Sequence, residues 1–186
     1  MTGPGTPGAP AAILIGPPGA GKSTVGPLLA ARLGVGFVDT DGRVEAVAGK
    51  PVSDIFIEDG EPAFRALERE AVAWAISAGG AGQGAEVRGA VIGLGGGAVL
   101  DSGTQRLLAG LPVVYLATGF AAAAKRVGLD RPRPLLAVNP RATLRALLEQ
   151  RLPVSEKLAW LTVSTDDRTP AEIVAEIVAH LPGPSR

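Results

Sequence analysis

Near the start of the chain, one run of eight residues follows the pattern G-x-x-x-x-G-K-[ST]: Gly16-Pro17-Pro18-Gly19-Ala20-Gly21-Lys22-Ser23. It comes directly after a short apolar run, residues 11–16, and opens a segment with helical spacing, residues 22–33. In such a unit the glycines let backbone N–H groups turn inward around a phosphate, and the helix N-terminus attracts negative charge. Lys22 can reach β- and γ-phosphates, and the Ser23 hydroxyl can ligate Mg²⁺. A chance glycine-rich turn is the alternative, but the position between strand and helix favours a nucleotide-phosphate loop.

Apolar runs and helical patterns continue to alternate along the chain. Strands are predicted at residues 11–16, 35–38, 91–94, 113–117 and 161–165, with helices at 22–33, 41–48, 53–59, 61–77, 102–109 and 173–181. Another helix is expected to open at Asn139-Pro140, with Asn139 as its cap, and to end near Arg151-x-Pro153. Pro27 should remove one backbone hydrogen bond and bend its helix. Five strands interleaved with helices predict a three-layer α/β sandwich with a five-stranded parallel sheet.

The length of 186 residues predicts one domain, because a single core stops growing at roughly 250 residues. Residues 11–181 are expected to form it. Residues 1–10 and 182–186 are rich in Gly and Pro and are predicted to be a flexible leader and a flexible tail. Residues 78–89 are expected to be a flexible connector within the fold.

Composition excludes several function classes. Lys plus Arg equal Asp plus Glu at 18 each, so the chain lacks the basic surplus that a broad nucleic-acid footprint requires. With no cysteine and only one histidine, His180, neither a thiol nucleophile nor a Cys- or multi-His metal centre is possible. Neither a secretory signal nor an apolar run of the ~20 residues that a membrane span needs is found. We therefore expect a cytoplasmic protein with no nucleic-acid or membrane partner.

Two aspartates follow the second predicted strand, in Asp39-Thr40-Asp41. Asp39 could hold Mg²⁺ through water, and Asp41 could accept a proton from, or a hydrogen bond of, a substrate hydroxyl. Helix capping is the alternative for both, since Asp is a common N-cap. The following Gly42 also completes a GTPase-like D-x-x-G, but it comes too soon after the phosphate loop and no N-K-x-D follows.

Other candidate residues lie in later segments. Arg65 follows Phe64 on the long 61–77 helix, and on its own it reads as a surface arginine paired with Glu61. Arg151 near a helix end could likewise only satisfy the helix dipole. Gly95-Gly96-Gly97 after the third strand could be a plain turn, or could let a ligand approach the backbone closely. Residues 128–139, rich in Pro and containing Arg133, could be a surface loop or a lid over a nucleotide.

In this order the motifs resemble those of the shikimate kinases, members of the nucleoside monophosphate kinase-like P-loop family, from about residue 11 to residue 181. The resemblance implies a P-loop kinase fold with a mobile lid over residues 128–139, and transfer of the γ-phosphoryl group of ATP to the 3-hydroxyl of shikimate. It implies Mg²⁺ at Ser23 and Asp39, and catalysis by Lys22, Asp41 and Arg133. The implied shikimate site comprises Asp41, Arg65, Gly95, Gly96, Gly97 and Arg151. The implied ATP site comprises Gly19, Ala20, Gly21, Lys22, Ser23, Thr24, Arg126, Arg133, Arg168 and Pro170.

Three positions depart from the family pattern. Ser155 replaces a usual tyrosine and is expected to loosen the packing behind Arg151, Gly93 replaces a small hydroxyl residue or alanine, and Pro27 replaces a usual arginine. A gluconate-type kinase is one alternative, but it would not be expected to carry the whole motif set. A nucleotide-dependent regulatory protein is the other, and intact Lys22 and Asp41 argue against it. We expect a monomer whose partners are ATP and shikimate.

Overall fold

The computed structural model describes residues 9–77, 89–128 and 139–181. Most of the predicted leader, connector and lid, and the predicted tail, lie outside these residues, as does Arg133. Within them, five parallel strands form one sheet in the order β2-β3-β1-β4-β5. The strands are β1 (Ala12–Ile15), β2 (Phe37–Asp39), β3 (Val91–Gly93), β4 (Val113–Ala117) and β5 (Leu161–Ser164).

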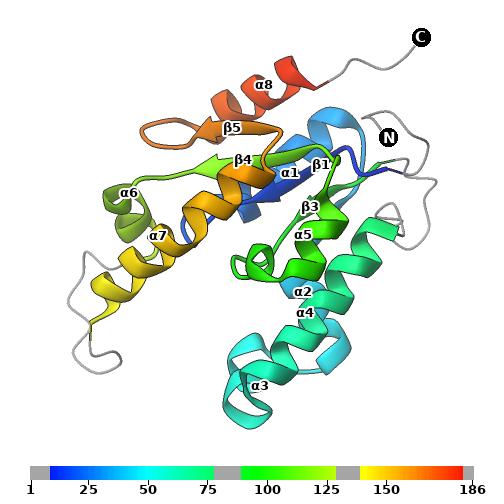
Figure 1. The fold of residues 1–186 in the computed structure, drawn as a ribbon. Helices are drawn as coiled ribbons and strands as arrows, with labels where there is room; N and C mark the ends of the chain where they lie inside the picture. Colours follow the sequence, from blue (N-terminus) through cyan, green and yellow to red (C-terminus); the bar gives the residue numbers. More distant parts are fainter. Residues whose placement is uncertain (1–8, 78–88, 129–138, 182–186) are drawn as a thin grey trace.

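Helices connect the strands and cover both faces of the sheet (Figure 1). The α-helices are α1 (Lys22–Leu33), α2 (Thr40–Ala48), α3 (Val52–Glu58), α4 (Gly60–Ser77), α5 (Ser102–Leu108), α6 (Phe120–Arg126), α7 (Pro140–Leu158) and α8 (Pro170–His180), with a 3-10 turn, η1, at Ala98–Leu100. The predicted three-layer α/β sandwich is therefore confirmed. No helix in the described ranges has the length and apolar character that crossing a membrane requires.

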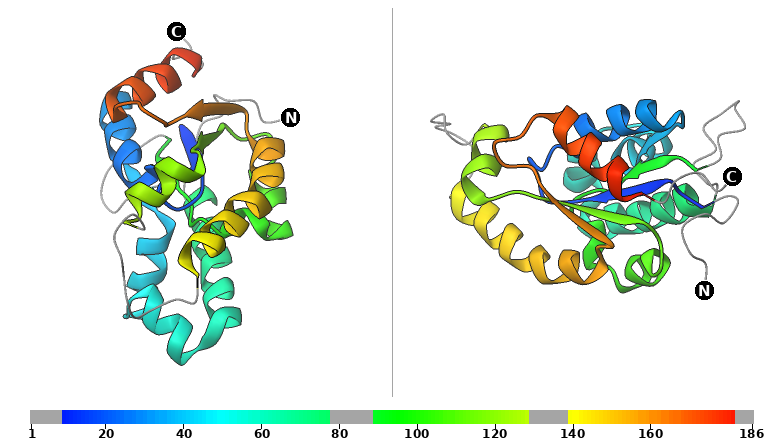
Figure 2. Two further views of the ribbon diagram at one scale, coloured as in Figure 1. Left: turned by 90° about the vertical axis from the view of Figure 1, so that its left-hand side faces the viewer. Right: turned by 90° about the horizontal axis from the view of Figure 1, so that it is seen from above.

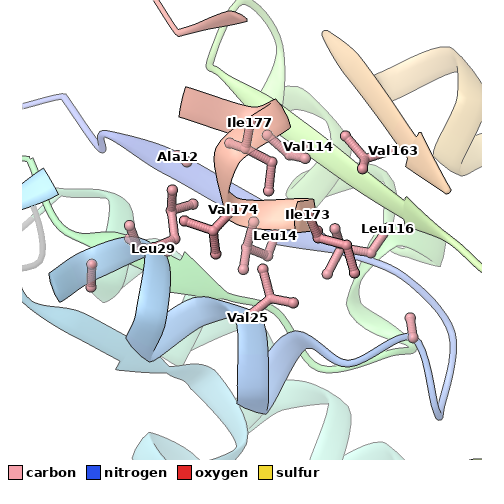
Figure 3. Close-up of a cluster of buried hydrophobic side chains, with 13 residues drawn as sticks. Ala12, Leu14, Val25, Leu29, Val114, Leu116, Val163, Ile173, Val174 and Ile177 are labelled. Atoms are coloured by element: carbon pink, nitrogen blue, oxygen red, sulfur yellow. The ribbon is translucent and has the colours of Figure 1, made fainter. Parts of the chain in front are cut away.

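Helices α1 and α8 cover one face of the sheet. Val25 and Leu29 of α1 pack with Ile173 and Ile177 of α8 over alternate residues of the strands, such as Leu14 (Figure 3). The opposite face is covered by α4, α5, η1 and α7, which pack on the intervening strand residues. All four residues of β1 are fully buried, because this central strand has protein on both faces.

Helices α2 and α3 form a small lobe with the part of α4 up to Ala71, at one end of the sandwich (Figure 2). The lobe has its own apolar cluster, in which Val44, Ile55, Phe64 and Ala71 are buried together. Helix α4 belongs to both units, since its later residues pack on the sheet. It therefore fixes the lobe to the sheet.

The prediction that a helix ends near Arg151-x-Pro153 is wrong. Helix α7 continues through Pro153 to Leu158, so Arg151 lies in its interior. A proline removes one hydrogen bond from a helix, but here Val154 and Leu158 pack against the core beneath the sheet and stabilise the following turn. Helix α6 was not predicted from its alanine-rich sequence, although it packs on α7 through Ala123 and Leu144. The prediction of the Asn139 cap is confirmed, because its side chain accepts the N–H of Ala142.

The Phe37 ring lies between two glycines, Gly26 of α1 and Gly93 of β3. A Cβ atom at Gly26 would overlap the ring, and one at Gly93 would lie 3.1 Å from it. Helix α1 can therefore approach β2 closely only because position 26 has no side chain. The same ring crowds position 93, where the family pattern led us to expect a larger residue.

Candidate active site

The carboxyl ends of the parallel strands meet at one edge of the sheet, and the predicted site residues follow them. The phosphate loop comes after β1, the two aspartates close and follow β2, and the triple glycine comes after β3. In open α/β sheets, ligands bind at this edge. Gly21 precedes α1 with a φ of 94°, a conformation that glycine adopts without strain, and the loop turns there into the helix.

Lys22 is the first residue of α1, and its side chain folds back over the loop. Its Nζ donates hydrogen bonds to the carbonyl oxygens of Gly16 and Pro17 at 2.6 and 3.2 Å. Burial lowers the pKa of Lys22 to about 8, while the negative charge of Asp41 opposes that shift. The ammonium group therefore lies over the concave side of the loop, where a phosphate would meet it.

A cleft of about 460 Å³ opens in front of the loop, and Lys22, Ser23, Asp39, Asp41 and Arg126 are among the residues that line it. Asp39 caps α2, because its Oδ1 accepts the N–H of Asp41 at 3.0 Å. The capping alternative is therefore correct for Asp39, and it does not exclude contact with a ligand, since the same residue lines the cleft.

The Asp41 carboxyl is largely shielded from water and lies near other negatively charged side chains. Its pKa is raised to about 6, first by burial and then by the negative charges of Asp39 and Glu68. Lys22 acts in the opposite direction and favours the charged form. A carboxylate with a raised pKa is better matched to accepting a proton from a hydroxyl near neutral pH.

Arg65 points from α4 toward the triple glycine and is held by two carboxylates. Its Nη1 donates to Glu68 at 2.6 Å, and its Nε and Nη2 donate to Glu61 at 3.2 and 3.1 Å. Burial lowers the pKa of Arg65, but its hydrogen bonds to Glu68 and Glu61 outweigh that effect and raise it overall. The surface pairing with Glu61 expected from the sequence exists, but the contact with Glu68 is buried and directs the guanidinium inward.

Arg151 reaches the same place from α7. Its pKa is lowered, first by burial and then by the positive charge of Arg65, so the two guanidinium groups lie close enough to repel each other. Among the described residues, the Nε of Arg151 is the one buried side-chain nitrogen or oxygen without a hydrogen-bond partner. Two neighbouring cations with an unused buried donor form a site suited to an anion, for which a carboxylate is a good geometric match.

The triple glycine touches the charged side chains on both sides of it. A Cβ at Gly95 would meet the Asp41 carboxylate and would lie 2.8 Å from Oε1 of Glu68. A Cβ at Gly96 would lie 2.8 Å from Nη1 of Arg151, and one at Gly97 would overlap the guanidinium of Arg65. The structure therefore brings Asp41, the glycines and both arginines together.

At the other end of the cleft, Arg126 joins the phosphate loop to the loop after β5. It donates hydrogen bonds to Gly19 O at 3.1 Å and to the Oγ1 and carbonyl oxygen of Thr165. Arg168 binds the Glu176 carboxylate and the Ser164 carbonyl, and Pro170 begins α8. Arg126 lines the cleft, whereas Arg168 is occupied by contacts within its own loop and helix.

Comparison with known proteins agrees with this geometry. Residues 18–182 match the family model described as shikimate kinase. The chain belongs to the shikimate kinase family. The function that the motifs led us to expect, ATP-dependent phosphorylation of shikimate, is the function of this family.

Individual relatives in the shikimate kinase family cover nearly the whole chain. The shikimate kinase of Thermobifida fusca (strain YX) is 57% identical over 173 residues, which is 93% of this chain and 95% of the relative. That of Salinispora arenicola (strain CNS-205) is 55% identical, covering 93% of this chain and 98% of the relative. A solved shikimate kinase from Acinetobacter baumannii in complex with shikimate is 32% identical, has a TM-score of 0.78 and covers 91% of each chain.

Reasoning from the sequence missed two buried residues of this site. Glu68 lies three positions after Arg65, a spacing that places both on one face of α4, but a charged residue on a helix is usually at the surface. Thr40 was passed over between the two aspartates, although its side chain is completely buried and its Oγ1 accepts the N–H of Gly95. Glu68 binds a residue on its own helix and Thr40 binds one 55 positions away, but both are identified by their burial in the folded chain.

The side chains near the phosphate loop also fit a magnesium ion. Ser23 and Asp39 line the same cleft and offer hydroxyl and carboxylate oxygens, which are the ligands that Mg²⁺ prefers. In the described ranges no group of three or more His, Cys, Asp or Glu residues is arranged to hold a metal. Few protein ligands are what a kinase site needs, because Mg²⁺ is usually held by one or two side chains together with phosphates and water.

Proposed function

We propose that this chain transfers the γ-phosphoryl group of ATP to the 3-hydroxyl of shikimate, and that the residues described above divide the work between two halves of one site. The observation that carries the proposal is the partnerless buried Nε of Arg151 beside Arg65, across the triple glycine from Asp41. An acceptor with both a carboxylate and a hydroxyl would satisfy the two arginines and Asp41 together.

The phosphate half is formed by the loop after β1. Its residues Gly19, Ala20, Gly21, Lys22, Ser23 and Thr24 would bind the phosphates, with Lys22 moving from its carbonyl partners to the β- and γ-phosphates. Arg126 would contact the adenine at the far end of the cleft, where it is held by Gly19 and Thr165. We also assign Arg168 and Pro170 to the adenine site. Arg168 binds Glu176 in this structure.

The acceptor half binds shikimate through its carboxylate and one hydroxyl. Arg65 and Arg151 would hold the carboxylate, and Gly95, Gly96 and Gly97 would form the close backbone surface between them and Asp41. Asp41 would accept a hydrogen bond from the 3-hydroxyl and take its proton as the oxygen–phosphorus bond forms. The bond between the γ-phosphorus and its bridging oxygen breaks, and ADP leaves. Most of the catalysis is positioning and charge stabilisation.

Ser23 and Asp39 would hold Mg²⁺ in this site. When bound, the ion supplies positive charge that neutralises the developing charge on the phosphates. Asp39 can bind the ion while its Oδ1 caps α2, because a carboxylate has two oxygens and several lone pairs.

Arg133 is proposed to supply further positive charge to the transferring group from the predicted lid, residues 128–139. A monomeric state and a cytoplasmic location also remain predictions, which gel filtration and cell fractionation test.

A coupled assay of ADP release tests the function directly. Purified protein is mixed with ATP and Mg²⁺ and given shikimate, gluconate or no acceptor. Of the three mixtures, we expect only the one with shikimate to release ADP, and we expect the shikimate in it to gain one phosphate. Turnover with gluconate but not shikimate would replace the proposal by the gluconate-type kinase, and nucleotide binding without turnover on either would favour the regulatory protein.

A further inference from the structure

Thr40 differs sharply from the aspartates on either side of it. Asp39 and Asp41 line the cleft, whereas the Thr40 side chain has 0% of its surface exposed. Its Oγ1 accepts a hydrogen bond of 2.9 Å from the N–H of Gly95, a residue 55 positions later in the chain. Both groups are buried, so the bond is not weakened by exchange with water.

This bond lies just past the end of the β2–β3 pairing. The last pair of that ladder joins Asp39 to Gly93, after which the two chains separate, one into α2 and the other into the triple glycine. The Thr40 hydroxyl continues the connection beyond the strands by taking the place of a backbone acceptor. A buried amide that lost this acceptor would pay its full desolvation cost, so the turn would shift to find another partner.

The turn that Thr40 holds is in contact with the acceptor half of the site. Gly95 lies directly against the Asp41 carboxylate and Glu68, and the next two glycines lie against Arg151 and Arg65. A displacement of Gly95 would therefore change the spacing between Asp41 and both arginines. The phosphate loop follows a different strand, β1, and it lies near the turn at Gly96, where an added Cβ would be 3.7 Å from Cδ of Pro18, an ordinary van der Waals distance.

We propose that Thr40 is a positioning residue for phosphoryl transfer: its hydroxyl locks the triple-glycine turn against the start of α2 and so sets the place of Asp41 relative to the carboxylate-binding arginines. The inference rests on the proposed function, because it concerns alignment of the acceptor in that same site. Thr40 touches neither substrate, and its effect is transmitted through Gly95 and Asp41.

Three variants separate the hydroxyl from the volume of the side chain. Thr40→Ser keeps the acceptor oxygen, Thr40→Val keeps the size but not the oxygen, and Thr40→Ala removes both without adding a methyl group beside the amide. Thr104→Val is the matched control, because Thr104 is also buried and its backbone N–H bonds to Asp101, the cap of α5, rather than to the site. Each is assayed for kcat, for KM of shikimate and for binding of an ATP analogue.

We expect Thr40→Val and Thr40→Ala to lose about 10- to 100-fold in kcat/KM for shikimate, since a displacement of about 1 Å can cost ~100-fold. Binding of the ATP analogue should change by less than about threefold, Thr40→Ser should retain most of the activity, and Thr104→Val should match wild type. Thr40→Ala keeps the test open if the valine variant does not fold.

Hydrogen exchange at the Gly95 amide gives a second readout that does not depend on turnover. The amide should exchange slowly in wild type and in Thr40→Ser, and faster in Thr40→Val or Thr40→Ala. The inference is overturned if a folded variant lacking the hydroxyl keeps wild-type kcat/KM, if the serine variant is as impaired as the alanine variant, or if ATP-analogue affinity falls in parallel. A wild-type protein inactive on shikimate would instead refute the proposed function, while the exchange result would still test the bond.

Discussion

Arg65 donates a hydrogen bond of 2.6 Å to Glu68, whose side chain is only 4% exposed. The same guanidinium donates to Glu61, whose side chain is 63% exposed. One arginine therefore has a buried partner and a solvated partner, both on its own helix. Because screening by water weakens the solvated pair, Glu68 should control the orientation of Arg65 and Glu61 should matter little.

Replacing Glu68 by alanine should raise KM for shikimate by about tenfold or more, which is ~1.4 kcal/mol, because Arg65 loses its buried partner. Glu61→Ala is the matched control on the same helix, and it should change KM by less than about fivefold, as exposed ion pairs contribute ~0–1 kcal/mol. Steady-state kinetics with shikimate varied at saturating ATP measures both. Equal effects of the two variants would show that burial of Glu68 does not orient Arg65.

The two-arginine anion site predicts discrimination between an acid and its amide. A shikimate analogue with a neutral amide should react ~30- to several-thousand-fold less efficiently, since an unpaired buried charge costs ~2–5 kcal/mol. Arg65→Ala and Arg151→Ala should each narrow the ratio of kcat/KM between acid and amide. Arg69→Ala, on the same helix as Arg65 but half exposed and paired at 3.9 Å with Asp101, should leave the ratio unchanged. If the acid-to-amide ratio of kcat/KM is the same in wild type and in all three variants, neither Arg65 nor Arg151 contacts the substrate carboxylate.

Substitutions of the two aspartates of the cleft should change different kinetic properties. Asp41→Asn keeps the shape but cannot take the hydroxyl proton, so kcat should fall by about 10²- to 10⁴-fold with nucleotide affinity little changed. Asp39→Asn should instead raise the Mg²⁺ concentration needed for half-maximal activity, because one negatively charged ligand is lost. Magnesium titrations and nucleotide binding, run on both variants, make the comparison. Loss of ATP affinity in Asp41→Asn would indicate that Asp41 binds the metal and does not accept the hydroxyl proton.

The cap of α5 predicts a pH dependence of stability that is independent of the active site. Asp101 accepts the N–H of Thr104 at 2.8 Å, and this bond is the main reason that its pKa is lowered. A lowered pKa in the folded state stabilises the fold fully above the unfolded value of ~3.9, and the contribution is lost as pH falls below it. Asp101→Ala should therefore reduce the free energy of unfolding by about 1 kcal/mol at pH 7, and by less near pH 3.

Urea unfolding at several pH values measures this difference. Asp101→Asn is the control, because asparagine caps a helix as well as aspartate but does not titrate. The difference between the asparagine and alanine variants should stay constant with pH. A gap between wild type and Asp101→Ala that is equally constant would show that the charge of Asp101 does not contribute.

The parts of the fold that the sequence predicted are those with a local physical cause. The phosphate loop and the Asn139 cap each depend on neighbouring residues, and both appear in the structure. The end of α7 was misplaced because Pro153 is a local signal for a break, while the packing of Val154 that overrides it comes from the sheet.

The candidate site was predictable only as a list of side chains. Resemblance to a family supplied Arg65 and Arg151, but their mutual repulsion and the partnerless Nε of Arg151 arise because the two side chains, from α4 and α7, meet at the triple glycine. The support for Arg65 from Glu68 and for the glycine turn from Thr40 depends on burial, which spacing alone did not indicate. Burial, and contacts between segments distant in sequence, were therefore the missing information.

The packing of Phe37 against Gly26 and Gly93 links three positions in a single volume constraint. A methyl group added at position 26 has no space while the ring is present, whereas a smaller residue at position 37 would create that space. Substitutions at these positions should therefore be strongly non-additive: Gly26→Ala should be harmful alone and much better tolerated with Phe37→Leu. Among relatives of this chain, we expect the sizes of these three residues to be inversely related: a larger residue at position 26 or 93 should occur together with a smaller residue at position 37.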